Sequence, residues 1–136
     1  MEKIAVIDDD QSIVDVFSQT LAFFGYDTCA FTDPAEALER LPREDPMPDV
    51  ILLDLMMSPM TGFQFLEELK KCAPLNGIPV IIVSAWDLAE ENLEYFKEII
   101  ADVIKKPVHP RELEERIRSV LDKEKNQGSD RKHGRK

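Results

Sequence analysis

The chain has 136 residues and a formal net charge of −10, a length that fits one domain with a sizeable core. It has no apolar stretch near the roughly 20 residues needed to cross a membrane. Its first apolar run is too short for the hydrophobic region of a secretory leader, so a cytoplasmic location is expected. Cys29 and Cys72 have neither disulfide-framework nor metal-ligand spacing, and both are expected to be packing residues.

The first half of the chain alternates buried strands with helices. Lys3–Ile7 predicts a strand. A helix is expected over residues Gln11–Phe24, with Gly25 as its stop and an apolar stripe formed by Ile13, Phe17, Leu21 and Phe24. A second strand, Tyr26–Phe31, precedes a helix that begins at Asp33, where a capping aspartate, a proline and an acid in the first turn follow one another.

The second half repeats the alternation. The expected strands are Asp49–Leu53, Pro79–Val83 and Ala101–Lys105, and the expected helices are Phe63–Cys72, Asp87–Lys97 and one that starts at His109-Pro110. Strands that alternate with helices indicate an α/β domain with a parallel sheet. We therefore expect a doubly wound five-stranded sheet with five helices, flavodoxin-like, in the strand order 2-1-3-4-5.

Charge divides the chain near residue 122. Residues 1–122 carry 25 acidic and 11 basic side chains, whereas residues 123–136 carry 2 acidic and 6 basic ones. The acidic body disfavours direct nucleic-acid binding. The last segment has no apolar residue to bury, so we expect residues 1–122 to form the domain and residues 123–136 a basic, disordered tail or linker stub.

Chemically capable side chains stand where four of the expected strands end. They are Asp8–Asp10, Asp54, Ser84 and the pair Lys105-Lys106. Taken singly, each has a structural explanation as a helix cap, a turn residue or a solvated charge. The carboxyl ends of parallel strands share one edge of a sheet, however, and ligands bind at that edge. The joint pattern therefore favours a single site.

These residue types predict a magnesium site that handles phosphate. Carboxylates held together repel one another, so that either a pKa rises or a cation binds. The oxygens of Asp8, Asp9 and Asp54 suit Mg²⁺, which also bridges to phosphate. A carboxylate can accept a phosphoryl group as an acyl phosphate. The Lys106 ammonium and the Ser84 hydroxyl can then bind the phosphoryl oxygens.

Four motifs in this order resemble the receiver domain of two-component response regulators, of the chemotaxis-receiver type. The motifs are Ile4–Asp9, Asp54–Gly62, Val83-Ser84-Ala85 and Lys106-Pro107, and the resemblance covers residues 2 to about 122. It implies that Asp54 is the phosphoacceptor. It also implies that Mg²⁺ is held by Asp8, Asp9, Asp54 and the backbone carbonyl of Met56. Ser84 and Lys106 would bind the phosphoryl group, with a cis Lys106-Pro107 bond.

The resemblance further implies a signalling domain of a phosphorelay rather than an enzyme in the usual sense. The phosphoryl donor would be a phosphohistidine of a histidine kinase or a histidine phosphotransfer protein. The expected output is a conformational switch read on the surface of the fourth helix, fifth strand and fifth helix. That surface pairs acids with bases and is a candidate homodimer interface, and solvated helix faces are the equal alternative.

Three departures from the family pattern matter. Proline follows the phosphoacceptor one position late, at Pro59 after Ser58, which predicts a shifted turn. Val103 stands where the family often has an aromatic residue that rotates inward on activation. Without such a ring, the fourth helix or Trp86 is expected to transmit the conformational change. Met56 and Trp86 are bulky apolar groups at positions that border the path of hydrolytic water in such domains, and they predict slow self-dephosphorylation.

Two other functions fit parts of the pattern. The chain could be a receiver-like interaction module that is never phosphorylated. It could also be a phosphatase resembling the haloacid dehalogenases, with Asp8 as nucleophile. That alternative leaves Asp54 unused, and it lacks the further acidic motif, because residues His109–Glu112 contain no aspartate pair.

Overall fold

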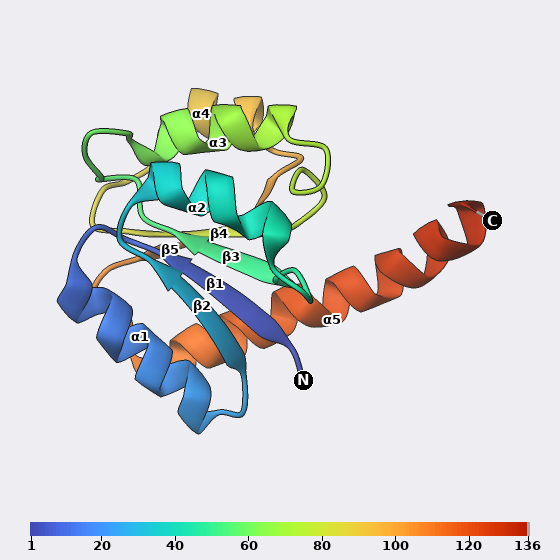
Figure 1. Cartoon of the computed structure of the whole chain (residues 1–136), viewed down its shortest axis with the longest axis horizontal. Helices are drawn as coiled ribbons and strands as arrows, with labels where there is room; N and C mark the ends of the chain where they lie inside the picture. The colour runs from blue at the N-terminus through green and yellow to red at the C-terminus, as the bar shows by residue number, and fades with distance from the viewer. Residues whose placement is uncertain (136) are drawn as a thin grey trace.

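The computed structural model describes the backbone of residues 1–135 and the side chains of residues 1–126. Its strands form one parallel sheet in the order β2-β1-β3-β4-β5 (Figure 1), which confirms the predicted topology. The strands are β1 (Lys3–Ile7), β2 (Asp27–Phe31), β3 (Val50–Leu53), β4 (Val80–Ser84) and β5 (Ile100–Lys105). The helices are α1 (Gln11–Phe23), α2 (Pro34–Arg40), α3 (Gly62–Lys71), α4 (Glu90–Tyr95) and α5 (Pro110–Arg135), with a short 3₁₀ helix, η1 (Leu41–Arg43), after α2.

Helices cover both faces of the sheet. Figure 1 shows α2, α3 and α4 on one side and α1 and α5 on the other. Because successive strand residues point to opposite faces, the central strands supply two cores. Ile7, Leu53 and Ile82 pack under α2–α4, whereas Val6 and Leu52 face α1 and α5. No helix in the described part of the chain is long and apolar enough to cross a membrane.

The fourth helix is shorter than the sequence pattern predicts. The expected range was 87–97, and α4 spans Glu90–Tyr95. Helices in proteins draw most of their stability from the packing of an apolar face. None of the residues of α4 is buried, and its first turn carries two glutamates, so the anchor is Phe96, just beyond its end. All other predicted element bounds lie within one residue of those observed.

The first helix also buries a slightly different face. Val14, Phe17 and Leu21 are buried, and Phe24, expected in the apolar stripe, is the C-cap and 36% exposed. The chain turns at Gly25, whose φ of 91° lies in the left-handed region that glycine tolerates. The predicted stop at this residue is therefore confirmed, with the last aromatic ring turned outward.

The C-terminal part of α5 consists of residues that the sequence analysis assigns to a tail. The described side chains include residues 123–126, which belong to α5. Residues 127–136 lie outside the residues whose side chains the structure describes. A domain limit at residue 122 and a disordered tail beyond it therefore stay predictions.

A bidentate ion pair fastens α5 to β5. The Arg116 guanidinium donates to both carboxylate oxygens of Asp102, at 2.6 and 2.7 Å, and to the backbone carbonyl of Val103 at 3.0 Å. These hydrogen bonds hold the pKa of the Asp102 carboxyl below its usual range, against the opposing effect of burial. The charged form of Asp102 therefore stabilises the fold.

Because the pKa of Asp102 is lowered in the folded state, its contribution is present above the unfolded pKa of about 3.9. It is lost as the pH falls through the folded value. We expect Asp102→Asn to lower the free energy of unfolding at pH 7 by about 1 kcal/mol. This deficit should shrink below pH ~4. Urea unfolding of both proteins across this pH range checks the prediction, and a deficit independent of pH would contradict it.

Gly62 lets the start of α3 approach the end of β3. A Cβ atom at this position would lie 2.5 Å from the backbone oxygen of Asp54 and 2.6 Å from the Cα atom of Leu55. Both obstructing atoms belong to the backbone and cannot rotate away. A glycine is thus required for α3 to begin against the β3 terminus.

We expect Gly62→Ala to lower the free energy of unfolding by about 1–3 kcal/mol, the usual cost of forcing an atom into a packed site. Gly77→Ala is the matched control, since a Cβ atom there meets no atom within 4 Å. The control should change stability by less than about 0.5 kcal/mol. Equal effects of the two substitutions in urea unfolding would show that the contact at Gly62 is relaxed.

Candidate functional site

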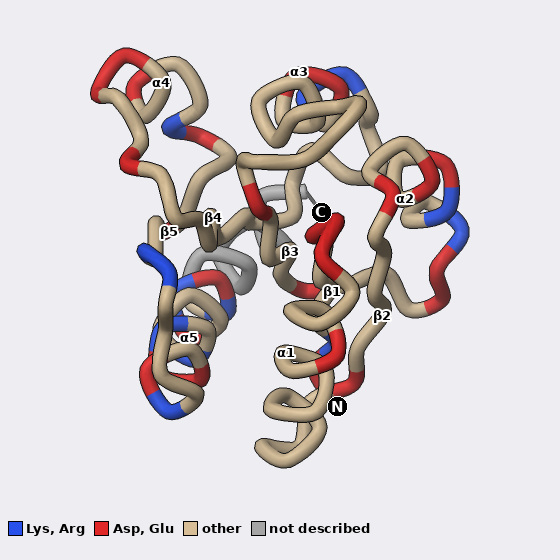
Figure 2. The backbone as a smooth tube through the Cα atoms, turned by 90° about the vertical axis from the view of Figure 1, so that its left-hand side faces the viewer, with Lys and Arg blue, Asp and Glu red and all other residues tan. Residues whose placement is uncertain are grey.

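The predicted residues meet at the carboxyl edge of the sheet. Figure 2 looks toward this edge, with acidic positions at the ends of β1 and β3. Asp8 follows β1, Asp54 follows β3, Ser84 ends β4 and Lys106 follows β5. Hydrogen bonds continue the sheet beyond the strands: the amide of Asp54 donates to the Ile7 carbonyl at 3.1 Å, and that of Lys106 to the Ser84 carbonyl at 2.9 Å.

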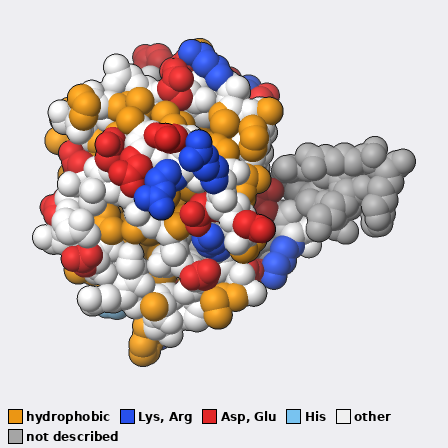
Figure 3. Space-filling model, viewed as in Figure 1, with side chains coloured by type: hydrophobic (Ala, Val, Ile, Leu, Met, Phe, Trp, Pro, Cys, Tyr) orange, Lys and Arg blue, Asp and Glu red, His pale blue; other side chains and the backbone are white. Residues whose placement is uncertain are grey.

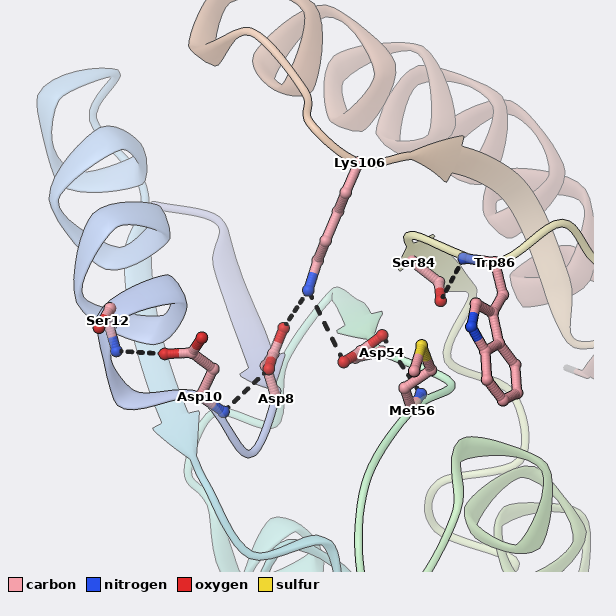
Figure 4. Close-up of polar contacts among 8 residues, drawn as sticks. All are labelled: Asp8, Asp10, Ser12, Asp54, Met56, Ser84, Trp86 and Lys106. Carbon is pink, nitrogen blue, oxygen red and sulfur yellow. Dashed lines mark hydrogen bonds and ion pairs between the residues drawn. The ribbon is translucent and has the colours of Figure 1, made fainter.

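Lys106 reaches across the edge toward two buried carboxylates (Figure 4). Its Nζ atom lies 2.7 Å from Oδ2 of Asp8 and 3.6 Å from Oδ2 of Asp54. Only 3% of Asp8 and 6% of Asp54 is exposed. The lysine therefore supplies positive charge where two acids have lost most of their water. The peptide bond between Lys106 and Pro107 is cis, as predicted.

Three carboxylates form a compact acidic group beside this lysine. One oxygen from each of Asp8, Asp9 and Asp54 lies within 4.8 Å of the others, and Asp9 is the exposed member. Burial raises the pKa of the Asp8 carboxyl, and the ion pair with Lys106 opposes that shift. Clustered hard oxygens beside solvent are the donor set that Mg²⁺ prefers. The three residues therefore fit a magnesium ion.

Asp10 has a different role from its two neighbours. Its Oδ1 atom accepts a hydrogen bond from the backbone amide of Ser12 at 2.9 Å, which caps α1. Its own amide donates to Oδ1 of Asp8 at 3.0 Å. The structural explanation, a helix cap, thus holds for the third acid of the run, and this cap helps to orient the first.

The loop after Asp54 is fixed at both ends. The amide of Met56 donates to Oδ1 of Asp54 at 3.3 Å, and the amide of Gly62 donates to the Leu55 carbonyl at 3.0 Å. Thr61 then begins α3 with a reciprocal capping box. Between these points the Ser58-Pro59 bond is cis. The role of the Met56 backbone carbonyl as a metal ligand stays a prediction.

Ser84 is buried at the end of β4, and its hydroxyl oxygen accepts from the backbone amide of Trp86 at 3.3 Å. The side chains of Met56 and Trp86 are 42% and 58% exposed. In Figure 4 they lie on the opposite side of Asp54 from Lys106. Val103 is partly buried against the core under α2–α4 and offers no ring to rotate.

Sequence analysis missed one ion pair at this edge. Lys105, treated as a solvated charge, has its Nζ atom 3.1 Å from Oδ1 of Asp87. The pair ties the end of β5 to the loop that follows β4. Both side chains are largely exposed, so the contribution to stability is small. Nothing in the local pattern of either segment indicates this contact.

Comparisons with known proteins show the family and the fold of the chain. The family model described as the response regulator receiver domain matches residues 4–118. The chain is 38% identical over 120 residues to a probable transcriptional regulator, ycf27, of Porphyridium aerugineum, covering 88% of this chain and 48% of that protein. It is 30% identical over 120 residues to the regulatory protein PhoP of Bacillus subtilis, covering 88% and 48%.

Two solved structures show the same fold. A CheY-like receiver domain protein from Methanospirillum hungatei has a TM-score of 0.81 and 30% identity, over 93% of this chain and 98% of that one. The N-terminal domain of a response regulator receiver protein from Methanoculleus marisnigri has a TM-score of 0.73 and 37% identity, over 89% of this chain and 97% of that one.

The chain spans about half the length of the curated relatives that it matches. The residues of this chain that the family model matches include the acidic group, the strand-end serine and the lysine that the geometry brings together. Sequence, fold and site thus lead to one assignment: the chain belongs to the family of response regulator receiver domains.

Proposed function

We propose that this domain accepts a phosphoryl group on Asp54 in a magnesium-dependent reaction and changes conformation as a result. The main support for this proposal is the position of the Lys106 ammonium between the buried carboxylates of Asp8 and Asp54. A purely structural ion pair would not require that the carboxyl edge of the sheet be open to solvent. Here the third acid, Asp9, faces solvent, which leaves room for a ligand.

The residues would divide the work as follows. Asp8, Asp9 and Asp54 would hold the magnesium ion, with the Met56 carbonyl as a further ligand. When bound, the ion supplies positive charge that offsets the repulsion between Asp54 and an incoming phosphate. Lys106 supplies a second positive charge, and its short contact with Asp8 fixes the position of its Nζ atom.

The chemical step is a transfer between two partners. A carboxylate oxygen of Asp54 attacks the phosphorus atom, the bond from phosphorus to the histidine nitrogen of the donor breaks, and that nitrogen keeps the electron pair and takes up a proton. The product is an aspartyl phosphate, an acyl phosphate. The domain supplies positioning and charge rather than an acid or base, which agrees with a signalling role.

The phosphoryl group would then reorganise its neighbours. It brings additional negative charge and strong acceptors to the buried edge. Lys106 can exchange Asp8 for a phosphoryl oxygen, and the Ser84 hydroxyl can leave the amide of Trp86 for another. Each charge-assisted hydrogen bond is worth about 1.5–3 kcal/mol. A few of them approach the roughly 5.5 kcal/mol that turns a 1:99 equilibrium into 99:1.

The partners follow from this chemistry and from the relatives. The donor would be a phosphohistidine on a histidine kinase or a histidine phosphotransfer protein. Relatives are named as transcriptional regulators, so the output of a longer protein would be control of transcription. The surface of α4, β5 and α5 stays a candidate homodimer interface. Arg116, one of the bases of this surface, is already paired with Asp102 in the same molecule.

Phosphorylation itself is testable with a small donor. Incubation with acetyl phosphate and Mg²⁺ should add one phosphoryl group to the protein, seen as a mass increase of the intact chain. Asp54→Asn should abolish the increase, since the amide is not a nucleophile of this kind. Removal of Mg²⁺ with a chelator should abolish it as well.

Asp122→Asn is the matched control, because it removes an exposed carboxylate of α5 far from the sheet edge. It should be labelled like the unmodified chain. Label that persists in Asp54→Asn and maps to Asp8 would support the phosphatase alternative. An unmodified chain that binds Mg²⁺ and takes no label would support the interaction module.

The lifetime of the phosphoryl group tests the role of Met56 and Trp86. Both apolar side chains stand beside Asp54 (Figure 4), where they would restrict the approach of water. After removal of the donor, we expect Met56→Asn with Trp86→Glu to lose label about tenfold faster than the unmodified chain, equivalent to ~1.4 kcal/mol of barrier. Val16→Asn, an exposed apolar position on α1, should leave the rate unchanged. Faster loss from the unmodified chain would refute the shielding.

A further inference from the structure

A groove runs between α2 and α3, on the helical face away from α1 and α5. Its volume is about 520 Å³. The walls combine apolar side chains of both elements and of the loop before α3, namely Leu38, Pro59 and Met60, with the glutamates Glu67 and Glu68. Figure 3 shows hydrophobic and acidic side chains intermingled on the surface in this view. An apolar groove with fixed polar groups has the character of a ligand site.

The Glu67 carboxylate is the unusual feature of this groove. Its Oε1 atom is buried and has no hydrogen-bond partner among the residues that the structure describes. A carboxylate oxygen without a partner in a sheltered position costs free energy, because its hydration is lost without replacement. The arrangement therefore has an unmet need for a hydrogen-bond donor.

The cations of α2 and α3 are not available to meet this need. Arg40 pairs with Glu36 at 3.1 Å, and Lys71 pairs with Glu68 at 3.4 Å. Lys70 lies over the Tyr95 ring, 4.1 Å from its centroid. The counter-charge for Glu67 thus has to come from outside the two helices.

We propose that the α2–α3 groove is a docking site for a peptide segment of a partner protein, in which an arginine or lysine flanked by apolar side chains pairs with Glu67. The apolar flanks would pack on Leu38 and Met60, and the cation would pair with the Glu67 carboxylate at the groove wall. Charge complementarity also favours such a partner at longer range, since residues 1–122 are strongly acidic. This docking does not require phosphorylation of Asp54.

The free protein gives a first test. If Glu67 lacks an internal partner, Glu67→Met should raise the midpoint of thermal unfolding by roughly 2–6 °C. Glutamate and methionine have similar helix propensities, so the change reports on the carboxylate. Glu68→Met, which removes an exposed carboxylate one position along, should not raise the midpoint. A marked loss of stability in Glu67→Met would show that the carboxylate is satisfied internally and would overturn the proposal.

The second test finds the partner chemistry. A library of random short peptides is selected on the full chain, with the Glu67→Gln variant as counter-selection. We expect enriched peptides in which arginine or lysine is flanked by leucine, isoleucine or phenylalanine. Their affinity should fall about tenfold or more on Glu67→Gln, and equally when citrulline replaces the arginine. Glu115→Gln, an exposed site on α5, should bind as tightly as the unmodified chain.

Amide chemical shifts of the labelled chain should change at the walls of the groove when the peptide binds. Three results would overturn the proposal: no peptide that distinguishes the chain from Glu67→Gln, equal binding of the citrulline peptide, or shift changes on another face. Glu67 bonded only to water would give the first of these. All three can be obtained whether or not Asp54 accepts phosphate.

Discussion

The site depends on one electrostatic arrangement, a lysine held among carboxylates that burial has stripped of water. Asp8 and Asp54 leave neighbouring strands with their side chains inside the edge of the sheet, and Lys106 crosses from β5 to reach both. Buried acids without a partner would be costly. The single cation lowers this cost without cancelling three negative charges, so the edge keeps a surplus that attracts a divalent ion. Stability and chemistry thus meet in the same contact.

The fold supports this arrangement from both faces. Strands that are buried on either side cannot shift in register without exposing apolar residues, so the positions at which they end are fixed. Gly62 adds a second constraint, since the start of α3 presses against the backbone of Asp54. The functional side chains are therefore placed by the packing of residues such as Leu53 and Ile82 that have no chemical role.

Sequence patterns predicted the parts that depend on periodicity and on strand ends. Continuous apolar runs identified the central strands, and the polar residue after each run identified Asp54, Ser84 and Lys106. Predictions failed where tertiary contacts decide. The helix α4 is short because its acidic residues are not buried against the core. Residue type alone cannot distinguish Asp10, which caps α1, from Asp8 and Asp9, which belong to the acidic group. Glu67 is invisible in the sequence because its isolation depends on how α2 lies against α3.

The close contact between α3 and the end of β3 has a consequence for signalling. Pro59 and Met60 belong both to the loop that follows Asp54 and to the wall of the groove. A rearrangement of that loop reshapes the groove, and an occupant that prefers one shape biases the loop by the same free energy, because linkage between two binding events is reciprocal. A partner bound on the helical face would then shift the populations of the loop conformations, and so act on the signal as well as respond to it.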